Sequence, residues 1–301
     1  MTRDELKSRL NGVTVPMITP MSDDEDLCEA GTRQFTRFLI ENGVAGVYPA
    51  SGCGEVWKLS GDERQRMMDI VLDEAEGRAL VIPGTGGGST REAIVMTEYA
   101  RDRGADAVVV WPPYFMGTAY NDDAIFNHFE SIAHAVDVPM IVYDSPEITG
   151  YPLSHDLVDR LADIDAVVGI KDSTGDMDSF VRRLERVGER ISVLQGWDSL
   201  LLASLAAGSP GAILSSANVC PRLVVEIVEA FHRGDLVQAR TQHAQLMAFI
   251  SSEPWQSDQF QAMKRLLVMQ DIQAGVIRRP WFTPPFTSDQ KRELQDSLNA
   301  L

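Results

Sequence analysis

Short apolar segments alternate with amphipathic segments along most of the chain. The apolar segments are rich in Val, Ile and Ala and are apolar at successive positions rather than at every second one. That pattern is typical of strands buried on both faces, as in a parallel sheet. The segments between them have helical spacing and follow loops rich in Gly, Pro or Ser. The eight predicted strands are residues 13–18, 46–49, 79–83, 107–111, 140–143, 166–171, 191–195 and 211–216.

Eight strand–helix units within about 230 residues match the arithmetic of a (β/α)8 TIM barrel. A doubly wound open sheet is the alternative, because alternation alone does not show whether the sheet closes on itself. We therefore predict an α/β fold in which residues 1–233 form a TIM-barrel catalytic domain. Residues 234–301 show helical patterns only and are predicted to form a C-terminal three-helix extension. Its helices are expected at 236–250, 260–271 and 288–301, with the Pro-rich segment 278–286 before the last one.

The composition is that of a globular protein and narrows the range of partners. The 301 residues include 27 basic and 44 acidic ones, and the net charge of −17 disfavours nucleic acid and anionic lipid. The three cysteines are far apart, which fits a reducing compartment better than a disulfide framework. The first residues lack an apolar signal segment, and no run approaches the ~20 apolar residues of a membrane-spanning helix. We therefore expect a cytoplasmic protein that acts on a small molecule.

Two side chains at the ends of predicted strands are candidates for covalent chemistry. Lys171 closes the run AVVGIK, and of the five lysines it alone ends a predicted buried strand. Partial desolvation favours the neutral amine, which can form a Schiff base with a ketone. Tyr143 closes MIVY in the same way, and its phenol could transfer protons to and from a substrate oxygen. The alternatives are a surface lysine that follows a strand and a tyrosine that packs in the barrel.

Two glycine-containing loops follow predicted strands. The loop SGCGE (51–55) offers backbone N–H groups ahead of a helix, which suits the binding of a carboxylate. The loop GTGGGST (84–90) is neither a Walker A motif nor a dinucleotide fingerprint, so its glycines are expected to allow a close approach to the barrel. Cys53 could be a thiol nucleophile, but no histidine accompanies it. The five histidines lack HxH or HExxH spacing, so we expect neither a metal nor a cofactor.

Together these strand ends resemble the dihydrodipicolinate synthase and N-acetylneuraminate lyase superfamily of class I pyruvate-type aldolases. The resemblance covers essentially the whole chain. One motif alone would be weak evidence, whereas seven in the same order are strong. They are the SGCGE turn, GTGGGSTREAI, PPYF, the YxxP that begins at Tyr143, GIKDS around Lys171, GWD, and GAILSSAN.

The resemblance implies roles for individual residues. Lys171 would form the Schiff base with a 2-oxo acid, and Tyr143 would be the proton-transferring phenol. The substrate carboxylate would bind to the turn at Gly52 and Cys53, with the carbonyl of Ile213 lining the site. Members of the superfamily are commonly homotetramers, and the apolar side chains of segment 278–286 would be a liability on an exposed surface. We therefore expect a homotetramer in which that segment is buried.

At several positions this sequence differs from the pattern usual in the synthases, and these differences narrow the range of expected substrates. The synthases usually carry two threonines at the positions of Gly52 and Cys53, a second tyrosine at the position of Phe115, and an arginine at the position of Ile148. Without that arginine, the second carboxylate of aspartate semialdehyde lacks a partner. The sequence YDSPEITG is closer to the lyase branch, whose loops bind sugar hydroxyls. Those contacts would fall here to Ser173, Gly196, Asp198 and Ser215.

A full-length sialic acid is disfavoured, because Ser199 replaces the acidic residue that sialate lyases usually show after the aspartate. We therefore predict a Schiff-base lyase for a 2-keto-3-deoxy sugar acid. Retro-aldol cleavage to pyruvate and an aldehyde and dehydration both remain open. The bulky aromatic residues Trp111, Phe115 and Trp197 are expected near the strand ends and the substrate, where they also favour a short sugar acid, although an aromatic aldehyde could stack on them. The alternatives are a dihydrodipicolinate synthase-type condensation of pyruvate with an aldehyde and a non-catalytic member of the family.

Overall fold

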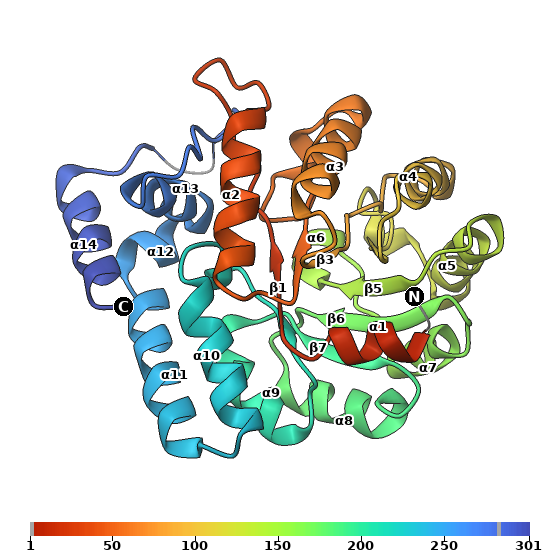
Figure 1. Cartoon of the computed structure of the whole chain (residues 1–301). Coiled ribbons are helices and arrows are strands. Elements are labelled where there is room, and N and C mark those ends of the chain that lie inside the picture. Colours follow the sequence, from red (N-terminus) through yellow and green to blue (C-terminus); the bar gives the residue numbers. More distant parts are fainter. Residues whose placement is uncertain (1–2, 282–283) are drawn as a thin grey trace.

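The computed structural model describes residues 3–281 and 284–301. Within them a single sheet of parallel strands forms the centre of the molecule (Figure 1). Each strand coincides with one of the predicted apolar runs. The strands are β1 (Val13–Pro16), β2 (Gly46–Tyr48), β3 (Leu80–Val81), β4 (Val108–Val110), β5 (Met140–Asp144), β6 (Val167–Asp172), β7 (Ser192–Gln195) and β8 (Ala212–Ile213).

The sheet closes on itself. Its strand order is β3-β2-β1-β8-β7-β6-β5-β4, so β3 and β4 are the two outermost strands of that order. Just beyond β3, Gly84 forms a parallel bridge with Val109 of β4. The Thr85 N–H donates to the Val109 carbonyl at 2.9 Å, and the Val109 N–H donates to the Pro83 carbonyl at 2.9 Å. These bonds confirm the predicted (β/α)8 barrel and exclude the open doubly wound sheet.

Helices follow the strands and surround the barrel (Figure 1). Several begin at the predicted kind of N-cap: the Ser89 hydroxyl accepts the Glu92 N–H at 3.2 Å, for example. The surrounding helices are α2 (Glu29–Glu41), α3 (Gly61–Ala75), α4 (Thr90–Asp102), α5 (Asp122–Ala135), α6 (Pro146–Thr149), α7 (His155–Ala162), α8 (Met177–Val187), α9 (Leu201–Ala207) and α10 (Pro221–His232). Short 3-10 helices are η1 (Val56–Lys58), η2 (Gly117–Ala119), η3 (Asp198–Leu200) and η4 (Ser216–Asn218).

An N-terminal helix, α1 (Arg3–Arg9), precedes the barrel and was not predicted. Leu6 and Leu10 are buried and belong to the same hydrophobic cluster as strands β3 to β7. The helix therefore covers part of the barrel that faces away from the carboxyl ends of the strands (Figure 1). Because its two apolar side chains lie in a charged segment, the apolar pattern there is too short to predict a helix from sequence.

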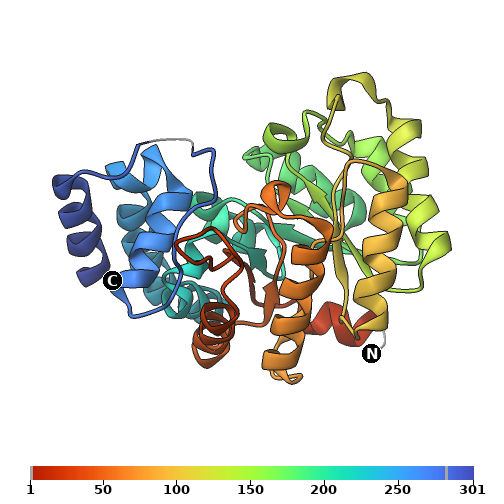
Figure 2. The same ribbon diagram turned by 90° about the horizontal axis from the view of Figure 1, so that it is seen from above.

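The C-terminal residues form a helical lobe on one side of the barrel (Figure 2). Three helices lie where they were expected, and the short α12 is additional. Asp258 explains the interruption, because it ends α12 and its side chain accepts the Gln261 N–H at the start of the next helix. The division of the chain at residue 233 stays a prediction. The helices are α11 (Leu236–Ile250), α12 (Glu253–Ser257), α13 (Gln259–Met269) and α14 (Ser288–Asn299).

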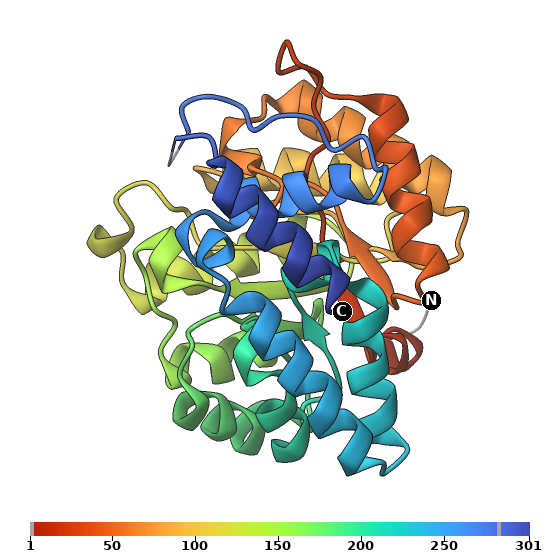
Figure 3. The same cartoon turned by 90° about the vertical axis from the view of Figure 1, so that its left-hand side faces the viewer.

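The lobe packs on the barrel through a shared hydrophobic cluster. Phe249, Trp255 and Leu266 from the lobe are buried together with Val15 of β1 and Ile227 of α10. Figure 3 shows the lobe from the side, with α14 crossing in front of the other C-terminal helices. The lobe therefore has a fixed position beside the ends of β1 and β8, which lets its helices reach the mouth of the barrel.

The Pro-rich segment has a mixed environment. Phe286 is buried, whereas Trp281 is 42% exposed and donates its indole N–H to the Ile277 carbonyl at 2.7 Å. The expected burial of Phe282 lies outside the described residues. None of the helices in the described part of the chain is long and apolar enough to cross a membrane.

Candidate active site

A cavity of about 510 Å³ opens at the carboxyl ends of the strands, where barrel enzymes carry their active sites. Strands β1, β5 and β6 contribute to it, as do the loops after β2, β7 and β8 and the helices α11 to α13. All but one of the predicted site residues line this cavity: Gly52, Cys53, Tyr143, Lys171, Ser173, Gly196, Asp198 and Ser215. The exception is Ile213, which is fully buried in β8 and is not among the lining residues, so the role of its carbonyl stays a prediction.

Lys171 and Tyr143 are direct neighbours at the base of the cavity. They face each other in the parallel pairing of β5 with β6. The Lys171 Nζ lies 4.3 Å from the centroid of the Tyr143 ring. Both side chains are nearly buried, with 5% and 7% of their surface exposed. A buried amine beside a phenol in a cavity is an arrangement that can form an imine and transfer a proton at it.

Tyr48 lies behind the cavity, close to Lys171, and the sequence analysis did not single it out. It ends β2, and its ring centroid lies 5.7 Å from the Lys171 Nζ. Burial raises the pKa of Tyr48 well above its usual value, so the phenol keeps its proton. Within the described residues its hydroxyl has no hydrogen-bond partner. The sequence did carry a signal, because Tyr48 is the next-to-last residue of the predicted run 46–49.

The turn at residues 51–55 is held rigidly against β1. The Ser51 hydroxyl donates to the Met17 carbonyl at 2.9 Å and accepts the Gly54 N–H at 3.1 Å. Glu55 has a left-handed backbone (φ 56°), and its buried carboxylate pairs with Lys264 of α13 at 2.9 Å. Such a fixed turn can present backbone N–H groups to a carboxylate without rearranging.

Cys53 is not suited to act as a nucleophile. Burial raises the pKa of its thiol to about 11, although Lys171 nearby acts in the opposite direction. The reactive species of a cysteine is the thiolate, which is scarce at neutral pH with such a pKa. Part of the side chain lines the cavity. Its role there is therefore one of shape and backbone position rather than covalent chemistry.

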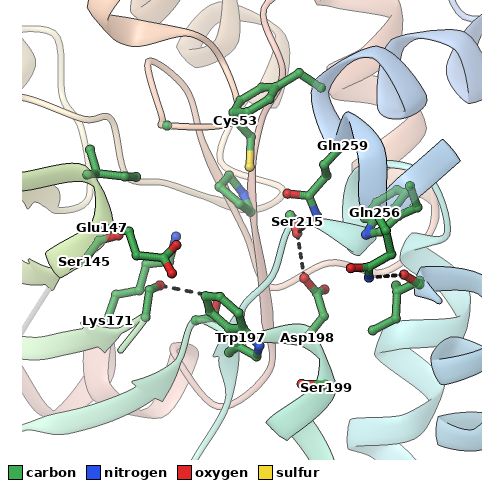
Figure 4. Close-up of a pocket in the computed structure, with 18 of the residues that line it drawn as sticks. Cys53, Ser145, Glu147, Lys171, Trp197, Asp198, Ser199, Ser215, Gln256 and Gln259 are labelled. Atoms are coloured by element: carbon green, nitrogen blue, oxygen red, sulfur yellow. Dashed lines mark hydrogen bonds between the residues drawn. The ribbon is translucent and has the colours of Figure 1, made fainter. Parts of the chain in front are cut away.

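A chain of hydrogen bonds forms the far wall of the cavity. The Ser215 hydroxyl donates to Asp198 Oδ2 at 2.6 Å, and the Ser216 N–H donates to Asp198 Oδ1 at 3.0 Å. Gln259, at the start of α13, donates its Nε2 to the Ser215 Oγ at 2.8 Å. Figure 4 shows Asp198, Ser215 and Gln259 opposite Lys171 and Glu147 across the cavity. This wall presents carboxylate, hydroxyl and amide groups to a ligand.

Gln256 and Gln259 also line the cavity, and the sequence analysis missed both. They lie at the end of α12 and the beginning of α13, in the segment that was assigned to the extension. Their distance in sequence from the barrel strands left no signal of their position. Packing of the lobe beside β1 and β8 brings them to the cavity.

The cavity lining carries fewer basic than acidic side chains, and they lie in different places. Among the described lining residues, Lys171 is the one basic side chain, and Glu147 and Asp198 are the acidic ones. Ile148 lines the cavity and is 46% exposed. A ligand carboxylate would therefore be attracted to the base, near Lys171, and not to the far wall.

The predicted aromatic lining is correct for one of three residues. Trp197 lines the cavity, whereas Phe115 is exposed and Trp111 is buried, and neither is among the lining residues. Trp111 instead lies against the glycine loop, where a Cβ at Gly86 would come within 2.4 Å of its ring. This confirms that a glycine of that loop permits a close approach.

Within the described ranges, no three His, Cys, Asp or Glu side chains are placed to hold a metal ion together. The site is thus built from an amine, a phenol, a turn with backbone N–H groups and a polar wall. Those groups at the mouth of a (β/α)8 barrel define a lysine-dependent lyase of the pyruvate-aldolase class.

Comparison with known proteins identifies the family. Residues 9–301 match the dihydrodipicolinate synthetase family, and the chain belongs to it. It is 40% identical to the 4-hydroxy-tetrahydrodipicolinate synthase of Methanopyrus kandleri over 79% of this chain and 80% of that protein. It is 34% identical to the enzyme of the same name from Methanothrix thermoacetophila over 96% of both chains.

A solved structure agrees with the assignment. The structure of YagE, a prophage protein of the dihydrodipicolinic acid synthase family from E. coli K12 in complex with pyruvate, superposes with a TM-score of 0.89. It is 28% identical and covers 96% of this chain and 97% of that one. The protein is therefore an enzyme, a class I lyase or synthase of this family, as the sequence motifs indicated.

Proposed function

We propose that Lys171 forms a Schiff base with a 2-keto-3-deoxy sugar acid and that Tyr143 transfers protons during its breakdown. The observation that carries this proposal is the pairing of the two residues in register at the base of the cavity, with Nζ 4.3 Å from the phenol ring centroid. The substrate carboxylate would bind to the turn at Gly52 and Cys53, which places its C2 carbonyl beside the amine.

The cleavage would proceed through the protonated imine. The neutral Lys171 amine adds to C2 of the 2-oxo acid, and the hydroxyl formed there takes the proton of Tyr143 and leaves as water, which gives the protonated imine and a phenolate. Tyr143 then accepts the proton of the C4 hydroxyl, the C3–C4 bond breaks, and its electrons move into the iminium to give an enamine. The aldehyde departs and C3 takes up the proton now held by Tyr143. Hydrolysis of the protonated imine releases pyruvate, restores the neutral amine and returns one proton to the Tyr143 phenolate. In dehydration, the same imine loses a C3 proton and expels a hydroxyl group.

The far wall supports this choice of substrate class. A sugar acid has one carboxylate, and the chain beyond it carries neutral hydroxyl groups. The wall offers such hydroxyls the Asp198 carboxylate, the Ser215 hydroxyl and the backbone at Gly196, while Ser173 lies nearer to Lys171. A hydroxyl can donate to one of these groups and accept from another, which a second carboxylate cannot do.

The rival function is condensation of pyruvate with aspartate semialdehyde, the activity class suggested by the names of the relatives. That reaction would bring a second carboxylate toward Ile148, Glu147 and Asp198. An apolar side chain and two acidic ones provide no partner for an anion. We therefore favour the sugar-acid lyase over the synthase.

A screen of 2-keto-3-deoxy acids tests the proposal, with pyruvate release and dehydration product measured separately. Borohydride should trap a covalent adduct on the peptide that contains Lys171. The same assays with pyruvate plus aspartate semialdehyde test the rival. Efficient turnover of pyruvate with aspartate semialdehyde, with no turnover of the sugar acids, would show that the enzyme is a synthase instead. The absence of a borohydride-trapped adduct in every mixture would favour a non-catalytic family member.

We also propose that the enzyme is a homotetramer. Tyr114, Phe115 and Met116 form an exposed group of large side chains in the loop after β4, and Trp281 is exposed on the lobe. Monomeric proteins rarely expose such apolar groups, so both surfaces are candidates for burial between subunits. Sedimentation equilibrium gives the mass directly, and a monomer mass at micromolar concentration would refute this.

A further inference from the structure

We propose that Arg183 is a positioning residue for the reaction, holding the ends of β5 and β6 together from outside the barrel so that Tyr143 and Lys171 stay in register. Arg183 does not line the cavity. It acts through Asp144 and Asp172, the residues that follow the phenol and the amine. The inference rests on the proposed role of Lys171.

The alternation of side chains along a strand explains this arrangement. Successive residues point to opposite faces, so a strand that directs Lys171 inward directs Asp172 outward, and the same holds for Tyr143 and Asp144. The pairing of β5 with β6 also places Asp144 opposite Asp172. Two carboxylates therefore lie side by side behind the two catalytic candidates, facing helix α8.

Arg183 of α8 bridges the two carboxylates. Its Nη2 lies 2.5 Å from Asp144 Oδ2, and its Nη1 lies 2.7 Å from Asp172 Oδ2. All three side chains are at most 2% exposed. The planar guanidinium fork can reach both oxygens at once, which the single ammonium of a lysine cannot do in the same geometry.

Further hydrogen bonds extend the network to the neighbouring loops. The Arg183 Nη2 also donates to the Leu153 carbonyl at 2.9 Å. The Asp172 Oδ1 accepts the N–H and the hydroxyl of Thr174 at 2.9 and 2.7 Å. The loops that follow both strands are thus fixed by the same three charged groups.

The charges make this network sensitive to the loss of Arg183. Burial raises the pKa of Asp144 to about 6, and the neighbouring Asp172 adds to that effect, while Arg183 opposes it. Without the guanidinium, two buried carboxylates would face each other across the β5–β6 pair. They would separate or take up a proton, and either response disturbs the strand ends. A misplacement of about 1 Å in an active site can cost about 10²-fold in rate.

Borohydride trapping with pyruvate tests the proposal on the full-length enzyme. Trapping rates at increasing pyruvate give a limiting rate and a half-saturating concentration. In Arg183→Gln we expect the limiting rate to fall about 10- to 100-fold. The half-saturating concentration should change less than about threefold, because the carboxylate is held by a different loop. The limiting rate is taken as the first-order rate constant of trapping. A loss of folded protein alone would lower the final yield of adduct and leave that rate constant unchanged.

Arg182→Gln is the matched control, since Arg182 is the adjacent residue on α8 and pairs only with exposed Asp178 on its own helix in the described contacts. It should trap at the wild-type rate. If Arg183→Gln does not fold, Asp172→Asn and Arg183→Lys replace it as test variants. Both should lower the limiting rate of trapping about 3- to 10-fold. Where Arg183→Gln does fold, Arg183→Lys should trap faster than Arg183→Gln, because it keeps the positive charge. Wild-type limiting rates in these folded variants would overturn the positioning role. Absence of trapping in the wild-type enzyme would instead overturn the proposed function.

Discussion

The base and the far wall of the cavity are built in different ways. At the base, Tyr143 and Lys171 come from adjacent strands whose backbone pairing sets their separation. At the far wall, Asp198 begins the short 3-10 helix η3, Ser215 lies in the loop after β8, and Gln259 comes from a helix that packs beside the barrel. The covalent chemistry is thus assigned to the most regular part of the fold, while substrate selection is assigned to parts that differ readily among barrels. The two regions should respond differently to mutation.

Lys171→Ala should have the largest effect. It removes the amine that we propose forms the imine, so turnover should fall by more than about 10⁴-fold, the scale seen when a nucleophile is removed. Intact-mass analysis after borohydride reduction with pyruvate should show no adduct. Lys58→Gln, a change at a half-buried lysine that does not line the cavity, should leave trapping at Lys171 in place. Equal adduct in Lys171→Ala would mean that another amine forms the imine.

Tyr143→Phe should have the next largest effect, and it also acts at the base. It keeps the ring against Lys171 and removes only the hydroxyl, so turnover should fall by roughly 10²–10⁴-fold. The folded state should persist, as judged by circular dichroism. Tyr151→Phe is a suitable control, because the Tyr151 hydroxyl donates to Asp122 and does not line the cavity. Near-normal turnover of Tyr143→Phe would assign the proton transfer to another group.

Ile148→Arg should alter selection without altering the chemistry. It adds a cation where the cavity has an apolar side chain, so condensation of pyruvate with aspartate semialdehyde should rise by about 10- to 100-fold, the value of one charged hydrogen-bonded pair. The rate of pyruvate trapping at Lys171 should change little. Ile148→Leu controls for the change of side chain. Efficient condensation already in the unmodified enzyme would show that the missing arginine does not determine the substrate.

The contrast between the two regions also explains what the sequence could predict. Apolar runs marked all eight strands, and the residue that ends each run marked Lys171 and Tyr143, because strand position and side-chain direction are local properties. The position of Gln259 depends on how α13 packs beside the barrel, and no local pattern encodes it. Trp111 is buried away from the cavity for a related reason. Its place just after β4 is a local property, but the direction of its side chain depends on the register and closure of the barrel.

Gln259→Leu should give the smallest effect and tests whether the far wall takes part in substrate selection. The change removes the amide that donates to the Ser215 hydroxyl at 2.8 Å and leaves a side chain of similar size. A neutral hydrogen bond contributes roughly 0.5–1.5 kcal/mol, so KM for a hydroxylated sugar acid should rise about 2- to 13-fold. The limiting rate of pyruvate trapping should be unchanged, because pyruvate has no chain that reaches the wall. Gln295→Leu, on the exposed face of α14, should alter neither value. If Gln259→Leu lowered trapping with pyruvate as well, the wall would be coupled to the base, and the division of the cavity into a chemical and a selective half would be wrong.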